Sequence, residues 1–135
     1  NIDQVVSFNK INLEFNECAI PIYFNNTGSS SYVKLSQDFK KIVDIKEKQL
    51  VSPLASSGVY MFGSIQLLKE CIEYGKKNKD LWVTSKLYSN SELFIGPCMT
   101  YCIKNDLNCY PVTTTQKIDL GSTKAINKLK IKLWT

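Results

Sequence analysis

The 135-residue chain contains no histidine and no arginine. Without histidine, it cannot build a Ser-His-Asp or Cys-His nucleophile system by itself, and the histidine-containing zinc motifs are excluded as well. The lack of arginine argues against a dedicated nucleic-acid binder, because such proteins rely on arginine for bidentate contacts. Carboxylates, lysine, tyrosine, cysteine, the backbone and a bound metal remain as sources of chemistry.

The sequence also lacks an apolar run long enough to cross a bilayer, and no charged-then-apolar leader opens it. We therefore expect a cytoplasmic protein that has no membrane partner. The net charge is +5, and lysines cluster at residues 76–79 and 124–132. Such a charge attracts phosphates or nucleic acid, but a composition rich in lysine, asparagine and isoleucine also explains it. We expect no nucleic-acid partner.

Five cysteines make an odd number without the spacing of a disulfide framework or a zinc site. They are Cys18, Cys71, Cys98, Cys102 and Cys109. The third and fourth of them are four residues apart and would share one face of a helix. We predict that all five are free or buried thiols of a protein in a reducing compartment.

The length and the 44% share of hydrophobic residues predict a single domain, residues 1–135, with a packed core. Residue patterns predict strands at 19–24, 32–35, 41–46, 55–62 and 109–114, and helices at 64–77, 91–105 and 123–132. Pro21 places the first strand's start there or puts the strand at a sheet edge. Pro97 kinks the second helix or starts its main part. The alternation of strands and helices in the second half favours an α/β fold.

Residues 9–16 fit either a strand or a poor helix. In the first predicted helix, Ser64 is a suitable N-cap. One apolar stripe at helical spacing follows, made of Ile65, Leu68, Ile72, Leu67 and Cys71.

A charged pair, Glu47 and Lys48, stands between a predicted strand and the loop that contains Pro53. The apolar run that follows, residues 55–62, has the pattern of a buried strand. Charges at the mouth of a buried strand can hold the polar groups of a ligand. The alternative is a surface ion pair, which contributes little to stability.

Three segments carry a resemblance to a known family. They are Asn1-Ile2-Asp3-Gln4, the stretch from Tyr32-Val33-Lys34-Leu35 through Glu47-Lys48 to Ser52-Pro53-Leu54-Ala55-Ser56-Ser57-Gly58-Val59-Tyr60-Met61-Phe62, and Ile118-Asp119-Leu120-Gly121-Ser122. In this order and with these gaps they resemble the sugar-phosphate nucleotidyltransferases, the family of the glucose-1-phosphate thymidylyltransferases and their capsule-pathway relatives. Ser91-Glu92-Leu93-Phe94-Ile95 is similar to the family's glutamate-containing segment before a helix.

The resemblance implies a Rossmann-like, GT-A-like α/β fold, with a mixed sheet flanked by helices. It also implies an enzyme that transfers a nucleotidyl group from a nucleoside triphosphate to a sugar phosphate and releases pyrophosphate. In the family, the glycine-rich nucleotide-binding loop precedes the first metal-binding aspartate, whereas two residues precede Asp3 here. We therefore expect the C-terminal, acceptor-binding part of the domain, in nucleotide-sugar and capsule polysaccharide biosynthesis.

The resemblance assigns Mg²⁺ to two aspartates, Asp3 and Asp119, with Ser122 where the family has threonine. It also implies that Glu47 faces sugar hydroxyls and that Lys48 faces the acceptor phosphate. The acceptor pocket would be lined by Ser57, Gly58 and Tyr60. This chemistry suits a chain without histidine, because the acceptor phosphate carries the attacking oxygen and the protein supplies positions and charge.

Two other interpretations stay open. In the first, the chain is a non-catalytic nucleotidyltransferase-like binding or regulatory module. In the second, it is an unrelated α/β domain whose Glu-Lys pair and aspartate are surface charges. The sequence leaves the nucleotide base, the acceptor and the oligomeric state open, including a homo-oligomer.

Overall fold

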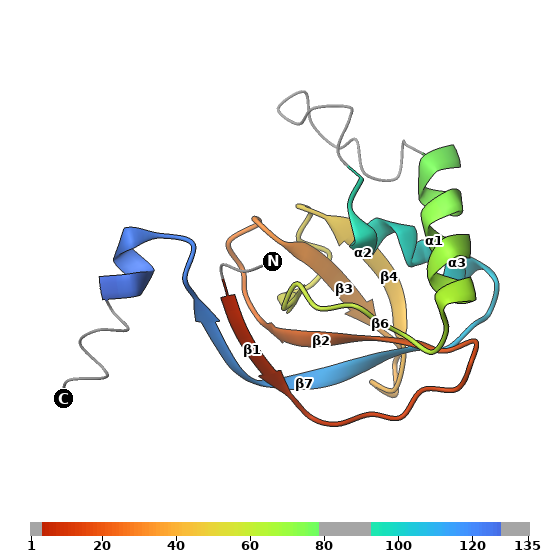
Figure 1. Cartoon of the computed structure of the whole chain (residues 1–135), viewed down its shortest axis with the longest axis horizontal. Coiled ribbons are helices and arrows are strands. Elements are labelled where there is room, and N and C mark those ends of the chain that lie inside the picture. The colour runs from red at the N-terminus through yellow and green to blue at the C-terminus, as the bar shows by residue number, and fades with distance from the viewer. Residues whose placement is uncertain (1–3, 79–92, 128–135) are drawn as a thin grey trace.

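The computed structural model describes residues 4–78 and 93–127. The strands are β1 (Gln4–Phe8), β2 (Cys18–Phe24), β3 (Ser31–Leu35), β4 (Ile42–Glu47), β5 (Leu54–Ser56), β6 (Met61–Phe62) and β7 (Cys109–Asp119), and the helices are α1 (Ile65–Lys77), α2 (Ile95–Cys98) and α3 (Thr100–Lys104). Residues 123–127 add a helical turn beyond the end of β7 (Figure 1). In these two stretches, no helix has the length and apolar character needed to span a membrane.

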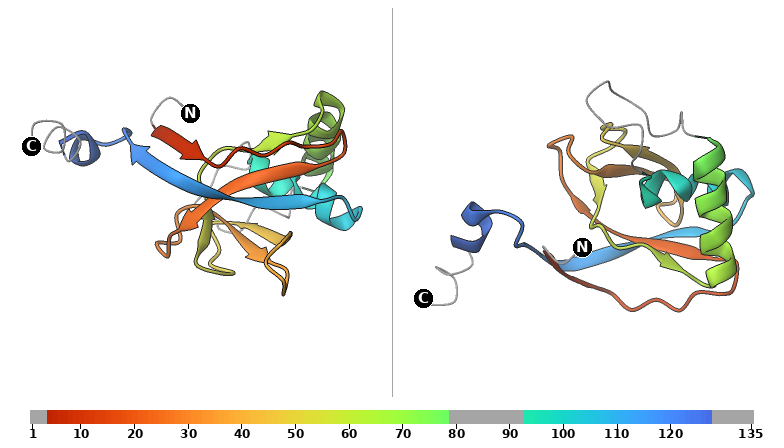
Figure 2. Two further views of the ribbon diagram at one scale, coloured as in Figure 1. Left: turned by 90° about the horizontal axis from the view of Figure 1, so that it is seen from below. Right: turned by 45° about the horizontal axis from the view of Figure 1, so that its top comes forward.

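The strands form one mixed sheet in the order β1-β7-β2-β5-β3-β4, and β6 pairs with β2 beside β5. β2 and β7 are parallel, whereas the other pairs are antiparallel. The three helices lie together over one face of the sheet (Figure 1). Figure 2 shows that the sheet is strongly twisted, so β3 and β4 cross the direction of β2 and β7. The α/β class and the mixed sheet are confirmed.

Helix α1 forms as its sequence predicts. Ser64 is the N-cap, and its Oγ accepts a hydrogen bond from the backbone N–H of Leu67 at 3.1 Å. Leu67 and Cys71 lie on the buried face, and two lysines occupy the last turn, where cations suit the helix dipole. Ile65 is 73% exposed, so its predicted place in the buried stripe is wrong.

The five cysteines are all free and buried, as predicted. They join the sheet to the helices: Cys18 and Cys109 come from β2 and β7, and Cys71 of α1 approaches Cys102 of α3 with 3.6 Å between the sulfurs. Burial raises the pKa of the Cys98 thiol to about 11. Because all five side chains are buried, they pack as small groups of the core.

The sequence predicts Pro21 at a strand start or sheet edge, which is wrong. Pro21 lies inside β2, level with Val112 of β7. On the other side, its carbonyl accepts a hydrogen bond from the N–H of Ser57 at 2.8 Å. The N and C=O of one strand residue point the same way, so the ring nitrogen faces the gap between β5 and β6. The ring nitrogen cannot donate there, and the β2–β5 ladder ends at the neighbouring pair, Ile22 and Ser56.

Four further predictions need correction. The expected strand at 55–62 is interrupted, because residues 57–60 leave the ladder between β5 and β6. The expected helix at 91–105 is two short helices, α2 and α3, and its proposed start at Ser91 and Glu92 lies outside the described residues. The last strand continues to Asp119 because β1 pairs with its second half. Residues 9–16 form neither a strand nor a helix.

Candidate functional site

A short chain of polar groups lies where β3 begins and β4 ends. Glu47 is the last residue of β4, is 5% exposed, and is the register partner of Ser31. Ser31 Oγ donates a hydrogen bond to Glu47 Oε2. Tyr60, from the segment between β5 and β6, donates from its hydroxyl to Ser31 Oγ at 3.4 Å. Three segments of the chain therefore meet at one buried carboxylate.

Burial governs the ionisation of this group of side chains. It raises the pKa of Glu47, while the Ser31 hydrogen bond and the Lys48 charge act in the opposite direction. Burial also raises the pKa of Tyr60, whose hydroxyl therefore keeps its proton at neutral pH. The site thus combines a carboxylate held in a poorly solvated position with two hydroxyl groups. Such a set suits hydrogen bonding to the hydroxyls of a ligand.

Helix α2 covers this polar chain because Gly96 allows a close approach. A Cβ at residue 96 would lie 2.9 Å from Ser31 Oγ and 3.1 Å from the Tyr60 hydroxyl. A larger residue would push the helix away from both. Sequence reasoning missed Gly96 and Ser31, and the only local signal was a glycine-proline pair at a helix start.

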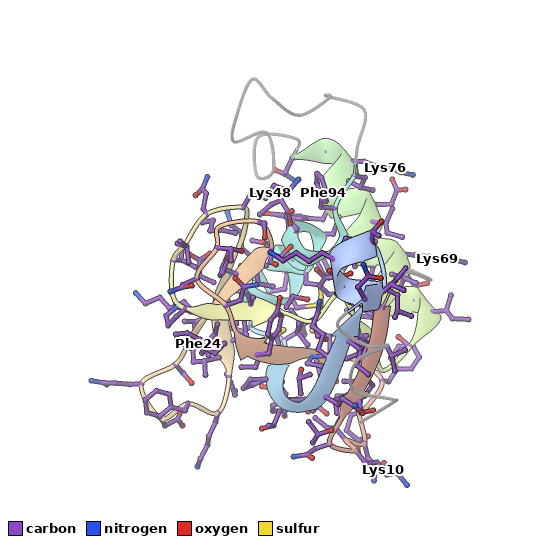
Figure 3. All side chains as sticks on the ribbon, turned by 90° about the vertical axis from the view of Figure 1, so that its left-hand side faces the viewer. Lys10, Phe24, Lys48, Lys69, Lys76 and Phe94 are labelled. Carbon is purple, nitrogen blue, oxygen red and sulfur yellow. The ribbon has the colours of Figure 1, made fainter. Side chains whose placement is uncertain are left out.

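Lys48 follows Glu47 but leaves the strand. Its φ is 52°, in the left-handed region, and its N–H donates to the carbonyl of Ser30 at 2.8 Å. The ammonium Nζ lies 5.0 Å from the ring centroid of Phe94, the residue before α2 (Figure 3). Glu47 and Lys48 therefore lie in different environments: Glu47 is buried, and Lys48 is half-buried beside an aromatic ring.

The predicted pocket residues Ser57 and Gly58 lie in the turn that carries Tyr60. Ser57 is 1% exposed, and among the described residues its Oγ has no hydrogen-bond partner. Gly58 has a φ of 89°, which favours glycine. A Cβ there would lie 2.5 Å from Nε2 of Gln4. This turn therefore connects the Glu47 site with the first strand.

Asp119 is the exposed last residue of β7, and its Oδ1 accepts a hydrogen bond from the N–H of Gly121 at 2.8 Å. Its register partner is Gln4, which directly follows Asp3 in the sequence. Asp3 itself lies outside the described residues. Over residues 4–78 and 93–127, no group of three Cys, Asp or Glu side chains is arranged to hold a metal ion.

The sequence matches no family model, and no curated protein matches it. Among solved structures, the crystal structure of the nucleoside-diphosphate-sugar pyrophosphorylase from Vibrio cholerae RC9 is similar, with a TM-score of 0.71 and 21% sequence identity. The match covers 95% of this chain and 52% of that chain, so this chain spans about half the length of that protein. Over nearly its whole length, this chain has the α/β fold of part of that pyrophosphorylase.

Proposed function

We propose that the chain is the acceptor-binding part of a sugar-phosphate nucleotidyltransferase. The enzyme transfers a nucleotidyl group from a nucleoside triphosphate to a sugar phosphate, or a similar small phosphate, in nucleotide-sugar and capsule polysaccharide biosynthesis. The observation that carries the proposal is the buried Glu47–Ser31–Tyr60 chain with Lys48 at its rim. It occurs on a fold that a pyrophosphorylase for nucleoside-diphosphate sugars shares over 95% of this chain.

In the proposed reaction, an oxygen of the acceptor phosphate attacks the α-phosphorus of the triphosphate. The bond from that phosphorus to the oxygen bridging to the β-phosphorus breaks, and pyrophosphate leaves. No protein nucleophile is needed, so the chain's residues act by positioning and by offsetting charge. Glu47 accepts hydrogen bonds from sugar hydroxyls, and Lys48 offsets the acceptor charge that would otherwise repel the triphosphate.

We propose Mg²⁺ as the cofactor, held by Asp3 and Asp119. The donor chemistry fits, because Mg²⁺ in phosphate-transfer sites is commonly bound by one or two carboxylates together with substrate phosphates. Asp119 offers an exposed carboxylate, and the β1–β7 register places the sequence neighbour of Asp3 opposite it. When bound, the ion would neutralise charge on the phosphate oxygens.

The test is a pyrophosphate-release assay on the full-length protein, with each nucleoside triphosphate, a panel of sugar phosphates and Mg²⁺. We expect release that requires one triphosphate, one acceptor and the metal, and that stops with a chelator. A folded protein that turns over no pair of substrates contradicts the enzyme. If the 135-residue chain nevertheless binds sugar phosphates by calorimetry, the binding or regulatory module is the better description.

A further inference from the structure

The contact between Lys48 and Phe94 joins the proposed phosphate-facing residue to a helix that sequence reasoning did not connect with it. The Nζ atom lies 5.0 Å from the ring centroid (Figure 3). A cation over an aromatic face within about 6 Å is attracted by the negative face of the ring. The interaction therefore has a direction, because the ammonium turns one side to the face of the Phe94 ring.

The backbone of Lys48, at the opposite end of the residue from its ammonium, is held in place. A non-glycine residue with a φ of 52° is uncommon, and such conformations persist where the surroundings hold them. Here the N–H of Lys48 donates to the carbonyl of Ser30, and Glu47 on its N-terminal side is tied to Ser31. The flexible four-carbon stem leads from this fixed point to the Phe94 ring.

Helix α2 and the residue before it lie close to the surroundings of both Glu47 and Lys48. Gly96 lets the helix approach Ser31 and Tyr60, which form the hydrogen-bonded chain to Glu47. Phe94, two residues earlier, lies beside Lys48. The helix itself packs against β4, α1 and α3, so it is a fixed platform for both contacts.

We propose that Phe94 is a positioning residue that holds the Lys48 ammonium at the rim of the Glu47 site, oriented to receive the phosphate of the acceptor. That the bound anion is an acceptor phosphate rests on the proposed function. The contact between the Phe94 ring and the Lys48 ammonium is independent of that function. Phe94 acts through Lys48 and has no contact of its own with the reacting atoms.

Replacing Phe94 by phenylalanines with one, three and five ring fluorines keeps its size and progressively removes the negative ring face. We expect the acceptor KM to rise stepwise, reaching about two- to five-fold for the pentafluoro ring, with kcat changed less than two-fold. Phe94→Leu should resemble the pentafluoro variant, and Phe94→Trp should restore the KM. Phe24→Leu is the matched control, because Phe24 is 70% exposed and lies away from Lys48 (Figure 3). A KM unaffected by fluorination overturns the proposal.

A second measurement is independent of turnover. Reductive methylation with ¹³C-formaldehyde labels the lysines, and Lys48→Arg assigns the Lys48 signal by its loss. We expect this signal to be shifted upfield by the ring current and to move downfield in Phe94→Leu but not in Phe24→Leu. A signal that does not respond to Phe94→Leu overturns the proposal. If the signal responds but no substrate pair is turned over, the positioning role stands and the proposed reaction fails.

Discussion

The side-chain amide of Gln4 lies where a side chain at Gly58 would begin, with Nε2 2.5 Å from the position of a Cβ. Gln4 opens β1 opposite Asp119, and Gly58 belongs to the turn that carries Tyr60 to Ser31. This contact therefore links the two ends of the described chain to the buried carboxylate site. The φ of 89° gives Gly58 a second, independent reason to be glycine.

We predict that Gly58→Ala lowers the free energy of unfolding by about 1–3 kcal/mol, measured by urea denaturation. Gly28→Ala is the matched control, because its φ is 79° but an added Cβ would meet only Leu50 Cδ1, at 3.9 Å. Gly28→Ala should therefore show the backbone strain without the clash. In a Gln4→Ala background, the excess cost of Gly58→Ala over Gly28→Ala should disappear. Equal costs for both substitutions in both backgrounds would show that the Gln4 side chain does not resist a Cβ at residue 58.

The raised pKa of Glu47 predicts a specific pH dependence of stability. Because the folded protein holds the Glu47 proton more tightly than the unfolded chain, stability falls as pH rises from about 4.3, the ordinary value for glutamic acid, through the raised pKa. Glu47→Gln keeps an acceptor for Ser31 and has no charge to bury. We expect its melting temperature to match the wild type near pH 4 and to exceed it at pH 8.

Glu73→Gln is the control for the sign of this effect. The hydrogen bond and charge of Lys76 lower the pKa of Glu73, so its contribution is present above about pH 4.3 and is lost as the pH falls. This variant should be no more stable than the wild type at pH 8. If Glu47→Gln is also less stable than the wild type at pH 8, the Ser31 hydrogen bond and the Lys48 charge outweigh the cost of burying the carboxylate.

Local patterns sufficed to predict α1 and the two strands β3 and β4. The cap at Ser64, for example, is a property of a few neighbouring residues. The interruption after Ser56 was not predictable in this way, because Ser57 lies opposite Pro21, far away in the sequence, whose carbonyl accepts the N–H of Ser57 but which has no N–H to return. For the same reason, the sequence named Glu47 and Tyr60 but not Ser31, which connects them through strand pairing.

Because the backbone at Lys48 is left-handed, two substitutions there can distinguish backbone strain from the binding role of the ammonium. Lys48→Ala and Lys48→Gly both remove the ammonium, and each should raise the acceptor KM by about ten-fold or more, as expected for a charge-assisted hydrogen bond to a phosphate. Only glycine relieves the Cβ strain at a φ of 52°. Lys48→Gly should therefore be about 1–2 kcal/mol more stable than Lys48→Ala in urea denaturation. An unchanged KM would count against the phosphate role, and equal stabilities would count against the left-handed conformation.

Asp119→Asn tests the proposed metal site without disturbing its surroundings. The asparagine Oδ1 can still accept the hydrogen bond from the N–H of Gly121, and residue 119 is exposed, so the melting temperature should change little. The charge that attracts Mg²⁺ is lost, so Mg²⁺-dependent pyrophosphate release should fall below detection. Asp38→Asn is the control, since this exposed aspartate accepts comparable turn hydrogen bonds from Ser36 and Lys40. A large loss of stability in Asp119→Asn would mean a structural role, and full activity would remove Asp119 from the metal site.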